Sequence, residues 1–246
     1  MSQISNNSEI IEFKNVSFGY TEDKMILKHV NLKFLKGKTY ALVGPTGGGK
    51  STTAALMVRL YDPNEGIVEF KNKDIRMFEP AELSKGIGFI LQEPFLFTGT
   101  VAQNIAYGNP DFEVIGEKEL EMFIEAEGLS KLLERFENGL KTEVSDNSQN
   151  ISLGQKQLVA FMRILLRKPE LLIMDEATAN IDTVTEQHLS EIISKLPKET
   201  TKVIIAHRLN TIKDADEIVF INNGIVKPSM TFDQAINLID SSKRNS

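Results

Sequence analysis

The sequence contains no cysteine, no excess of basic residues and no long apolar run. Without cysteine, the chain forms neither disulfides nor thiolate metal sites, and its composition fits a reducing compartment. The formal net charge of -6 leaves no cationic surface of the kind that neutralises nucleic-acid phosphates, so we expect no nucleic-acid partner. No apolar stretch approaches the roughly 18 to 20 residues that cross a bilayer, so any link to a membrane is expected to come from another segment.

The N-terminal residues 1–9 are polar and lack both the basic start and the apolar stretch of a signal peptide. We interpret them as a short leader. The whole sequence has 246 residues, of which 41% are hydrophobic. That is enough to bury a substantial core, in one large domain or two smaller ones.

Apolar periodicity predicts an α/β fold. Residues 11–18, and then Val30, Leu32 and Phe34, alternate as in the strands of an opening sheet. Short apolar runs predict buried strands, with helical patterns between them: strands at 39–43, 171–174 and 203–206, and helices at 50–60 and 152–166. Strands that alternate with helices imply a largely parallel sheet.

A helical insertion is predicted between about Glu93 and Leu153. Apolar residues recur there at helical spacing, around Phe123 and around Leu132, with Gly128 between the two groups. Acidic side chains outnumber basic ones in this region, which fits a solvated outer face better than a specific docking patch.

The segment Gly44-Pro45-Thr46-Gly47-Gly48-Gly49-Lys50-Ser51 fits the phosphate-loop pattern of glycine, any four residues, and then Gly-Lys-Ser/Thr. Small residues let backbone N–H groups turn inward around phosphates, and the helix that begins near Lys50 points its positive end at them. We expect Lys50 to bridge the outer phosphates and Ser51 to hold magnesium. The position of the segment, after a strand and before a helix, argues against a mere turn.

Two adjacent carboxylates, Asp175 and Glu176, follow the predicted strand 171–174, at the edge where open α/β sheets bind ligands. In phosphate-loop enzymes an aspartate at this point coordinates magnesium, directly or through water, and the next position can orient the attacking water. An acidic pair alone would be a solvated edge or a helix cap. In a chain that also carries a phosphate loop, the pair favours the functional interpretation.

Residues 11–239, which contain these motifs, resemble the nucleotide-binding domain of ATP-binding cassette transporters, and of exporters in particular. Tyr20, in Val-Ser-Phe-Gly-Tyr, matches the aromatic residue that stacks on adenine, although alone it would be a packing tyrosine. Gln92, in Phe-Ile-Leu-Gln-Glu, matches the glutamine that contacts magnesium and senses the membrane domain. The stretch from Phe95 to Gly108 is similar to the exporter segment that meets the coupling helices of the membrane domain.

Two further matches concern the reaction and the dimer. His207, in Ile-Ile-Ala-His-Arg-Leu, matches the switch histidine that contacts the γ-phosphate. Asp182 fits the loop through which two domains of a family dimer communicate, and without that context it would be a helix cap.

The resemblance implies ATP and Mg²⁺ as cofactors and assigns a role to each matched residue. The catalytic residues would be Glu176, His207 and Lys50, and the metal ligands would be Ser51, Gln92 and Asp175. The nucleotide would be bound by Tyr20, Gly44, Thr46, Gly47, Gly48, Gly49, Lys50, Ser51, Thr52 and Gln92. The signature residues Ser152, Gly154 and Gln155 would bind the ATP held by a partner.

The resemblance also implies a domain plan. We expect residues 1–246 to form a single nucleotide-binding domain with a mostly parallel core sheet and an antiparallel β subdomain near the N-terminus. Residues 1–92 and 167–246 would form the ATP-binding core, and residues about 93–166 a helical subdomain that carries the signature. The partners would be transmembrane domains, fused or separate, at the cytoplasmic face of a membrane, and a second nucleotide-binding domain; the chain by itself is expected to be soluble.

The signature departs from the family pattern LSGGQ, because the chain reads Ile151-Ser152-Leu153-Gly154-Gln155. The signature of this family begins a helix that faces the γ-phosphate of ATP on the opposite subunit, where close backbone approach and the helix dipole bind the anion. The Leu153 side chain would crowd that approach unless it points away. The preceding residues 142–148 also lack the glycines and glutamate common in exporters, which puts coupling through that loop in doubt.

A degenerate signature beside Glu176 and His207 resembles one half of heterodimeric exporters. We therefore expect a heterodimer in preference to a homodimer, with one competent and one slower site. Two alternatives stay open: a non-transport member of the same ATPase family, and a nucleotide-binding module without hydrolysis. The sequence does not identify the transported substrate. It is also compatible both with a domain excised from a longer chain and with a separate subunit.

Overall fold

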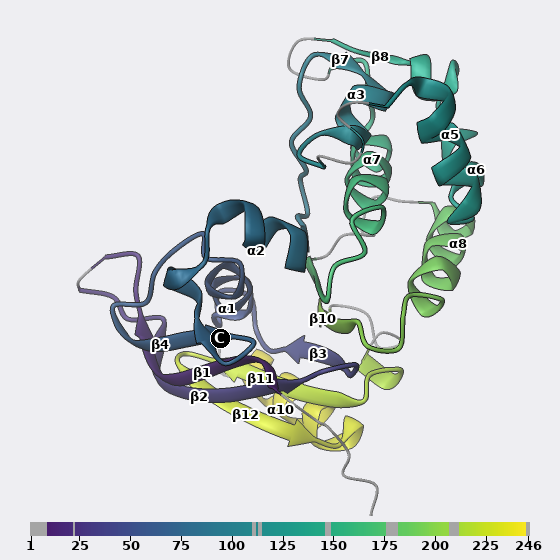
Figure 1. Ribbon diagram of the computed structural model, residues 1–246. Coiled ribbons are helices and arrows are strands. Elements are labelled where there is room, and N and C mark those ends of the chain that lie inside the picture. Colours follow the sequence, from purple (N-terminus) through teal and green to yellow (C-terminus); the bar gives the residue numbers. More distant parts are fainter. Residues whose placement is uncertain are drawn as a thin grey trace, which may run out of the picture. The chain divides into compact units, whose positions relative to one another are not determined.

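A computed structural model of the protein describes residues 9–21, 23–109, 112, 115–145, 149–175, 182–206 and 212–244 (Figure 1). The chain divides into two compact units. The first comprises Met1–Ile87, Glu170–Asp175 and Lys198–Ser246, and the second comprises Gly88–Pro169 and Glu176–Pro197.

An antiparallel sheet of four strands opens the first unit, in the order β2-β1-β4-β5. The strands are β1 (Glu9–Phe18), β2 (Leu27–Leu35), β4 (Glu65–Phe70) and β5 (Lys73–Asp74). Val30, Leu32 and Phe34 alternate with exposed residues along β2 and are buried, as their spacing predicts. The sheet thus has one face on the core and one in water.

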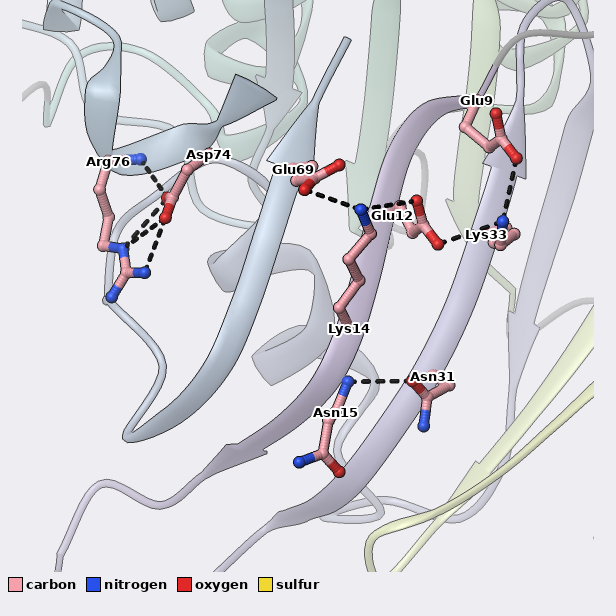
Figure 2. Close-up of polar contacts among 9 residues, drawn as sticks. All are labelled: Glu9, Glu12, Lys14, Asn15, Asn31, Lys33, Glu69, Asp74 and Arg76. Atoms are coloured by element: carbon pink, nitrogen blue, oxygen red, sulfur yellow. Dashed lines mark hydrogen bonds and ion pairs between the residues drawn. The ribbon is translucent and has the colours of Figure 1, made fainter. Parts of the chain in front are cut away.

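The solvated face of this sheet carries a cross-strand ladder of charges (Figure 2). Glu12 of β1 lies opposite Glu69 of β4 and opposite Lys33 of β2. The Lys14 ammonium lies 2.8 Å from the Glu69 carboxylate and 3.5 Å from that of Glu12, and Lys33 lies 3.1 Å from Glu12. Lys14 therefore bridges the carboxylates of Glu12 and Glu69, which would otherwise repel each other across the strands, and Lys33 adds a second positive charge beside Glu12.

The central sheet follows the strand order β12-β11-β3-β10-β9-β6. Its strands are β3 (Thr39–Val43), β6 (Ile87–Ile90), β9 (Leu171–Asp175), β10 (Thr201–Ile205), β11 (Glu217–Asn222) and β12 (Ile225–Met230). β11, β3, β10 and β9 run parallel and β12 is antiparallel at the edge. The predicted α/β fold with a mostly parallel sheet is thus confirmed, and β10 begins two residues earlier than predicted.

The helices described in the first unit are α1 (Lys50–Met57), α2 (Pro80–Gly86) and α10 (Phe232–Arg244). α1 begins at the predicted residue but ends three residues before the predicted Leu60, because the N–H of Leu60 turns back to the carbonyl of Ala55 at 2.9 Å. Apolar residues of β3, β11 and α10, among them Val43, Phe220 and Ala235, form one buried cluster of this unit.

The second unit is built mainly from helices (Figure 1). They are α3 (Val101–Ala106), α5 (Glu117–Ala126), α6 (Ser130–Leu133), α7 (Leu153–Leu165) and α8 (Thr183–Ser194), and β7 (Gly99–Thr100) pairs with β8 (Glu143–Val144). α7 packs against α3 and buries Leu158, Phe161 and Met162. In the described ranges, no helix combines the length and the apolar character that crossing a membrane requires.

Candidate functional site

The phosphate loop occupies the connection between β3 and α1. Gly44, Gly47 and Gly49 have φ angles of 145°, 75° and 112°, which favour glycine because a Cβ atom strains the backbone there. A Cβ added at Gly47 would meet nothing within 4 Å, whereas one at Gly48 would lie 2.8 Å from the carbonyl oxygen of Ile221. The loop is therefore packed on β11 at one side and open at the other.

The N-terminus of α1 is suited to an anion. Its N-cap, Gly49, offers no side chain to the first N–H groups, and the first turn holds no acidic residue. These groups and the helix dipole present positive potential at the loop. The buried Lys50 side chain adds a full positive charge. Its Nζ is held at the loop by hydrogen bonds to the carbonyls of Gly44 at 3.0 Å and Pro45 at 2.9 Å. Backbone, dipole and ammonium thus fit a phosphate chain.

An aromatic cluster stands beside α1. The Tyr20 side chain is 52% exposed, and its hydroxyl shares a hydrogen bond of 3.2 Å with the Thr52 hydroxyl on α1. The Tyr20 ring contacts the rings of Phe18 and Tyr61, each with a centroid separation of 5.1 Å. Tyr20, the predicted base-stacking residue, therefore lies in the same unit as the phosphate loop and is hydrogen-bonded to α1, the helix that follows this loop.

Asp175 is the last residue of β9, at the edge of the sheet from which the phosphate loop also emerges. It pairs in register with Ile205 of β10, and Ile205 pairs with Leu42 of β3. Two strand spacings separate β9 from β3, or about 10 Å at the backbone. Asp175 and the exposed Ser51 therefore belong to one edge of one unit, and their carboxylate and hydroxyl oxygens are ligands that Mg²⁺ accepts.

The signature residues begin α7 in the second unit. Ser152 is the N-cap: its Oγ accepts from the N–H of Gln155 at 3.2 Å, and Gln155 Oε1 accepts from the N–H of Ser152 at 2.9 Å. This capping box uses the hydroxyl of Ser152 as an acceptor and leaves its O–H as a donor. Leu153 and Gly154 form the first two helical positions, and the first turn contains no acidic residue.

Gln92 belongs to the second unit and is linked to α7. Its carbonyl oxygen accepts a hydrogen bond of 2.9 Å from Nε2 of Gln157, a side chain that is fully buried. Gln157 thus connects the segment of Gln92 to the helix that carries the signature.

Asp182 caps α8. Its carboxylate accepts from the N–H of Thr185 at 3.1 Å and from the Thr185 hydroxyl at 2.7 Å, and it pairs with Arg135 at 3.1 Å. These bonds, first those from Thr185, lower the pKa of Asp182. The helix-cap alternative is thus realised, and a role in dimer communication stays a prediction.

Two predicted catalytic residues, Glu176 and His207, lie outside the described residues. Of the remaining predicted site residues, the structure brings Tyr20, the phosphate loop, Thr52 and Asp175 together in the first unit. Gln92, Ser152, Gly154, Gln155 and Asp182 are in the second unit.

Sequence reasoning missed three residues that support these positions. Tyr61 contacts Tyr20, Gln157 binds the Gln92 carbonyl, and Arg163 of α7 donates to the Asn104 carbonyl of α3 at 2.7 Å. Burial lowers the pKa of Arg163 to about 10, and the neighbouring Arg167 adds to this shift. Gln157 and Arg163 are polar residues within the apolar pattern of α7, and this departure could have indicated that they support the site. Nothing in the local sequence indicated a contact between Tyr61 and Tyr20.

Comparisons with known proteins agree with this geometry. The family model described as "ABC transporter" matches residues 27–179. Two curated relatives come from Bacillus subtilis (strain 168). "Uncharacterized ABC transporter ATP-binding protein YfiC" is 43% identical over 92% of this chain and 37% of its own length, and "Putative multidrug export ATP-binding/permease protein YgaD" is 40% identical over 91% of this chain and 38% of its own.

A solved structure, "a bacterial Atm1-family ABC exporter with ATP bound", is similar over 99% of this chain and 43% of its own, with a TM-score of 0.84 and 32% identity. This chain therefore spans less than half the length of the proteins to which it is similar. The match of the family model, the arrangement of the phosphate loop and the exporter fold together show that the chain belongs to the ABC transporter family, as an ATP-binding domain of the exporter type.

Proposed function

We propose that this chain is the ATP-hydrolysing motor domain of an ABC exporter, and that it drives transport through transmembrane domains. The observation that carries the proposal is the phosphate loop. An uncapped helix N-terminus, a glycine-lined turn and the buried Lys50 ammonium converge on one point. This arrangement supports binding of a nucleoside triphosphate by its phosphates.

In the proposed reaction a water molecule attacks the γ-phosphorus in line, and the bond from this phosphorus to the β,γ-bridging oxygen breaks. Lys50 neutralises charge on the outer phosphates, and His207 contacts the transferred group. Glu176 orients the water and accepts its proton. ADP and inorganic phosphate are the products.

Ser51, Asp175 and Gln92 are the proposed magnesium ligands. Bound magnesium would neutralise the charge of the β- and γ-phosphate oxygens. Ser51 and Asp175 supply suitable oxygens at one edge of the first unit. Gln92 is included on the resemblance of its segment to the family motif alone.

A second nucleotide-binding domain is proposed to complete the site. The α7 N-terminus, with the Ser152 hydroxyl and the N–H groups of Leu153 and Gly154, has the features of an anion-binding helix end. We propose that it binds the γ-phosphate of ATP held by the partner chain. ATP would then favour the closed dimer and hydrolysis would release it.

Leu153 favours a heterodimer. It stands at the first helical position of α7, and its side chain is only partly buried. A partly exposed leucine at this point would hinder the approach of a phosphate, so this chain's signature would form the slower of two sites. The site with this chain's phosphate loop would be the competent one.

The proposed contact with the membrane domains is the segment around α3. Phe95 and Tyr107 are 77% and 58% exposed. Tyr107 also lines a hollow of about 630 Å³, together with apolar residues that include Phe97, Phe112 and Leu120. Apolar surface of this kind marks an interaction site. Through this contact the chain would lie at the cytoplasmic face of a membrane.

Hydrolysis is tested with Glu176→Gln, because this change keeps the shape of the side chain and removes the base. The variant should bind MgATP as the wild type does, lose at least about 100-fold in phosphate release, and elute as a dimer with ATP. Glu125→Gln, on the exposed face of α5, is the matched control and should change nothing. Undiminished turnover in Glu176→Gln would remove Glu176 from its role.

The asymmetric dimer has its own test. Turnover is measured for the chain alone, for Leu153→Gly alone, and for the chain mixed with candidate partner domains. We expect Leu153→Gly to raise the turnover of the chain alone. Full turnover by the wild-type homodimer at both sites would contradict the heterodimer proposal.

A further inference from the structure

A second tyrosine packs against the predicted base-stacking residue. The rings of Tyr20 and Tyr61 have centroids 5.1 Å apart and planes at 81°, and Phe18 contacts Tyr20 at 5.1 Å and 84°. Both pairs have the edge-to-face geometry that aromatic rings favour. Two nearly perpendicular neighbours restrict rotation of the Tyr20 ring and so fix the plane on which a base would stack.

The backbone after α1 determines where Tyr61 lies. The N–H of Arg59 donates to the carbonyl of Leu56 at 3.2 Å, and the N–H of Leu60 donates to that of Ala55 at 2.9 Å. These are the two bonds of a Schellman motif, in which the first residue after the helix cap adopts the left-handed conformation. Arg59 supplies it with a φ of 55°. The chain reverses there and places Tyr61 two residues later.

Side-chain contacts hold this turn in place. Arg59 is not glycine, so its left-handed conformation carries strain. Its Nη1 donates to the carbonyl of Phe78 at 3.2 Å, and its Nε lies 3.3 Å from the Asp62 carboxylate. These bonds offset the strain and fix the turn that presents Tyr61.

Both ends of α1 therefore bear on the candidate site. Its N-terminus faces the phosphate loop, its Thr52 hydroxyl bonds to the Tyr20 hydroxyl, and its C-terminal turn presents Tyr61 to the Tyr20 ring. Tyr20 and Tyr61 remain 52% and 47% exposed, so ring surface is left for a ligand. One helix thus relates the phosphate position to the plane of the aromatic platform.

We propose that Tyr61 is a positioning residue for base recognition, which holds the Tyr20 ring in the orientation that stacks on the base of a bound nucleoside triphosphate. The site thereby prefers a nucleotide with a base to inorganic tripolyphosphate. The inference rests on the proposed function, because it takes Tyr20 as the base-stacking residue.

The test compares binding of MgATP and of magnesium tripolyphosphate by isothermal titration, for wild type, Tyr61→Ala, Tyr61→Phe, Tyr20→Ala and the double alanine variant. Tyr61→Ala should weaken MgATP binding about 3- to 10-fold, the equivalent of one edge-to-face pair. Tyr61→Phe should restore it, because the ring is kept. Binding of tripolyphosphate should change less than about twofold in every variant, because the phosphate loop is intact. Thermal unfolding verifies that each variant is folded.

The double variant separates positioning from direct contact. If Tyr61 acts through Tyr20, adding Tyr61→Ala to Tyr20→Ala costs less than about a further twofold in MgATP affinity. The inference is overturned if Tyr61→Ala binds MgATP like the wild type, if tripolyphosphate affinity falls in parallel, or if the two changes are additive. If the wild type itself does not bind MgATP, the proposed function fails and the inference with it.

Discussion

A glycine-to-alanine change in the phosphate loop should weaken nucleotide binding at one position and folding stability at another. At Gly47 a new Cβ atom meets nothing within 4 Å, so the cost is the left-handed backbone alone, about 1–2 kcal/mol of stability. That methyl group lies on the open side of the loop, where a phosphate would approach. We expect Gly47→Ala to fold but to bind MgATP at least about tenfold more weakly.

At Gly44 the same change should act on folding. Its φ is 145°, and a Cβ atom would overlap the carbonyl oxygen of Ile221 on β11. Backbone strain and overpacking together give a loss of about 2–6 kcal/mol. Gly44→Ala should therefore be far less stable than Gly47→Ala.

A third glycine supplies the matched control. Gly128, in the turn after α5, has a φ of 71° and also open space around an added Cβ atom. Gly128→Ala should cost as much stability as Gly47→Ala and leave MgATP binding unchanged. Urea unfolding followed by circular dichroism measures the stabilities, and isothermal titration the affinities. The reasoning is refuted if Gly47→Ala binds MgATP like the wild type, or if Gly44→Ala is as stable as Gly47→Ala.

Three further predictions concern residues that support the fold. Hydrogen bonds from Arg76 hold the pKa of Asp74 in the folded protein below its ordinary value of 3.8 (Figure 2). The stability that the Asp74 carboxylate contributes is therefore present above pH 3.8 and is lost as the pH falls through the pKa of the folded state. Asp74→Asn should lower the urea midpoint at pH 7, and the midpoints of wild type and variant should converge below pH 3.8; a constant difference would contradict this. Gln157→Leu should lower the free energy of unfolding, measured with urea, by about 1 kcal/mol. Gln157→Glu should lower it by about 3 kcal/mol or more, because a buried carboxylate would face the Gln92 carbonyl. Equal losses would argue against the hydrogen bond from Gln157 to the Gln92 carbonyl. Arg163→Lys should lose about 1.5–3 kcal/mol in the same assay, because an ammonium cannot reproduce the guanidinium contacts with α3, and a neutral effect would show that these contacts do not matter.

Local patterns predicted the elements that carry the phosphate loop. Residues 40–43 form an uninterrupted apolar run because β3 is covered on both faces, and the predicted strand 39–43 matches β3 at both ends. The start of α1 at Lys50 followed from the motif. Its end did not, because a left-handed arginine terminates the helix where glycine is the usual signal.

Contacts between residues far apart in the sequence were not predictable in this way. Tyr61 meets Tyr20 only because the turn after α1 returns the chain to β1, and the Gln157 bond to Gln92 depends on how α7 packs. Leu153 was found as a departure from a pattern, and its position at the start of α7 follows from the Ser152 cap. The roles of Glu176 and His207 stay predictions from the resemblance.

The most direct test of the central claim is the binding of MgATP to wild type and to Lys50→Ala by isothermal titration. The wild type should bind one MgATP per chain. Lys50→Ala should bind at least about tenfold more weakly while it stays folded, because it loses the charge-assisted bonds of a buried ammonium to the phosphates. Equal affinity in the two proteins, or a wild type that binds no MgATP, would contradict the account.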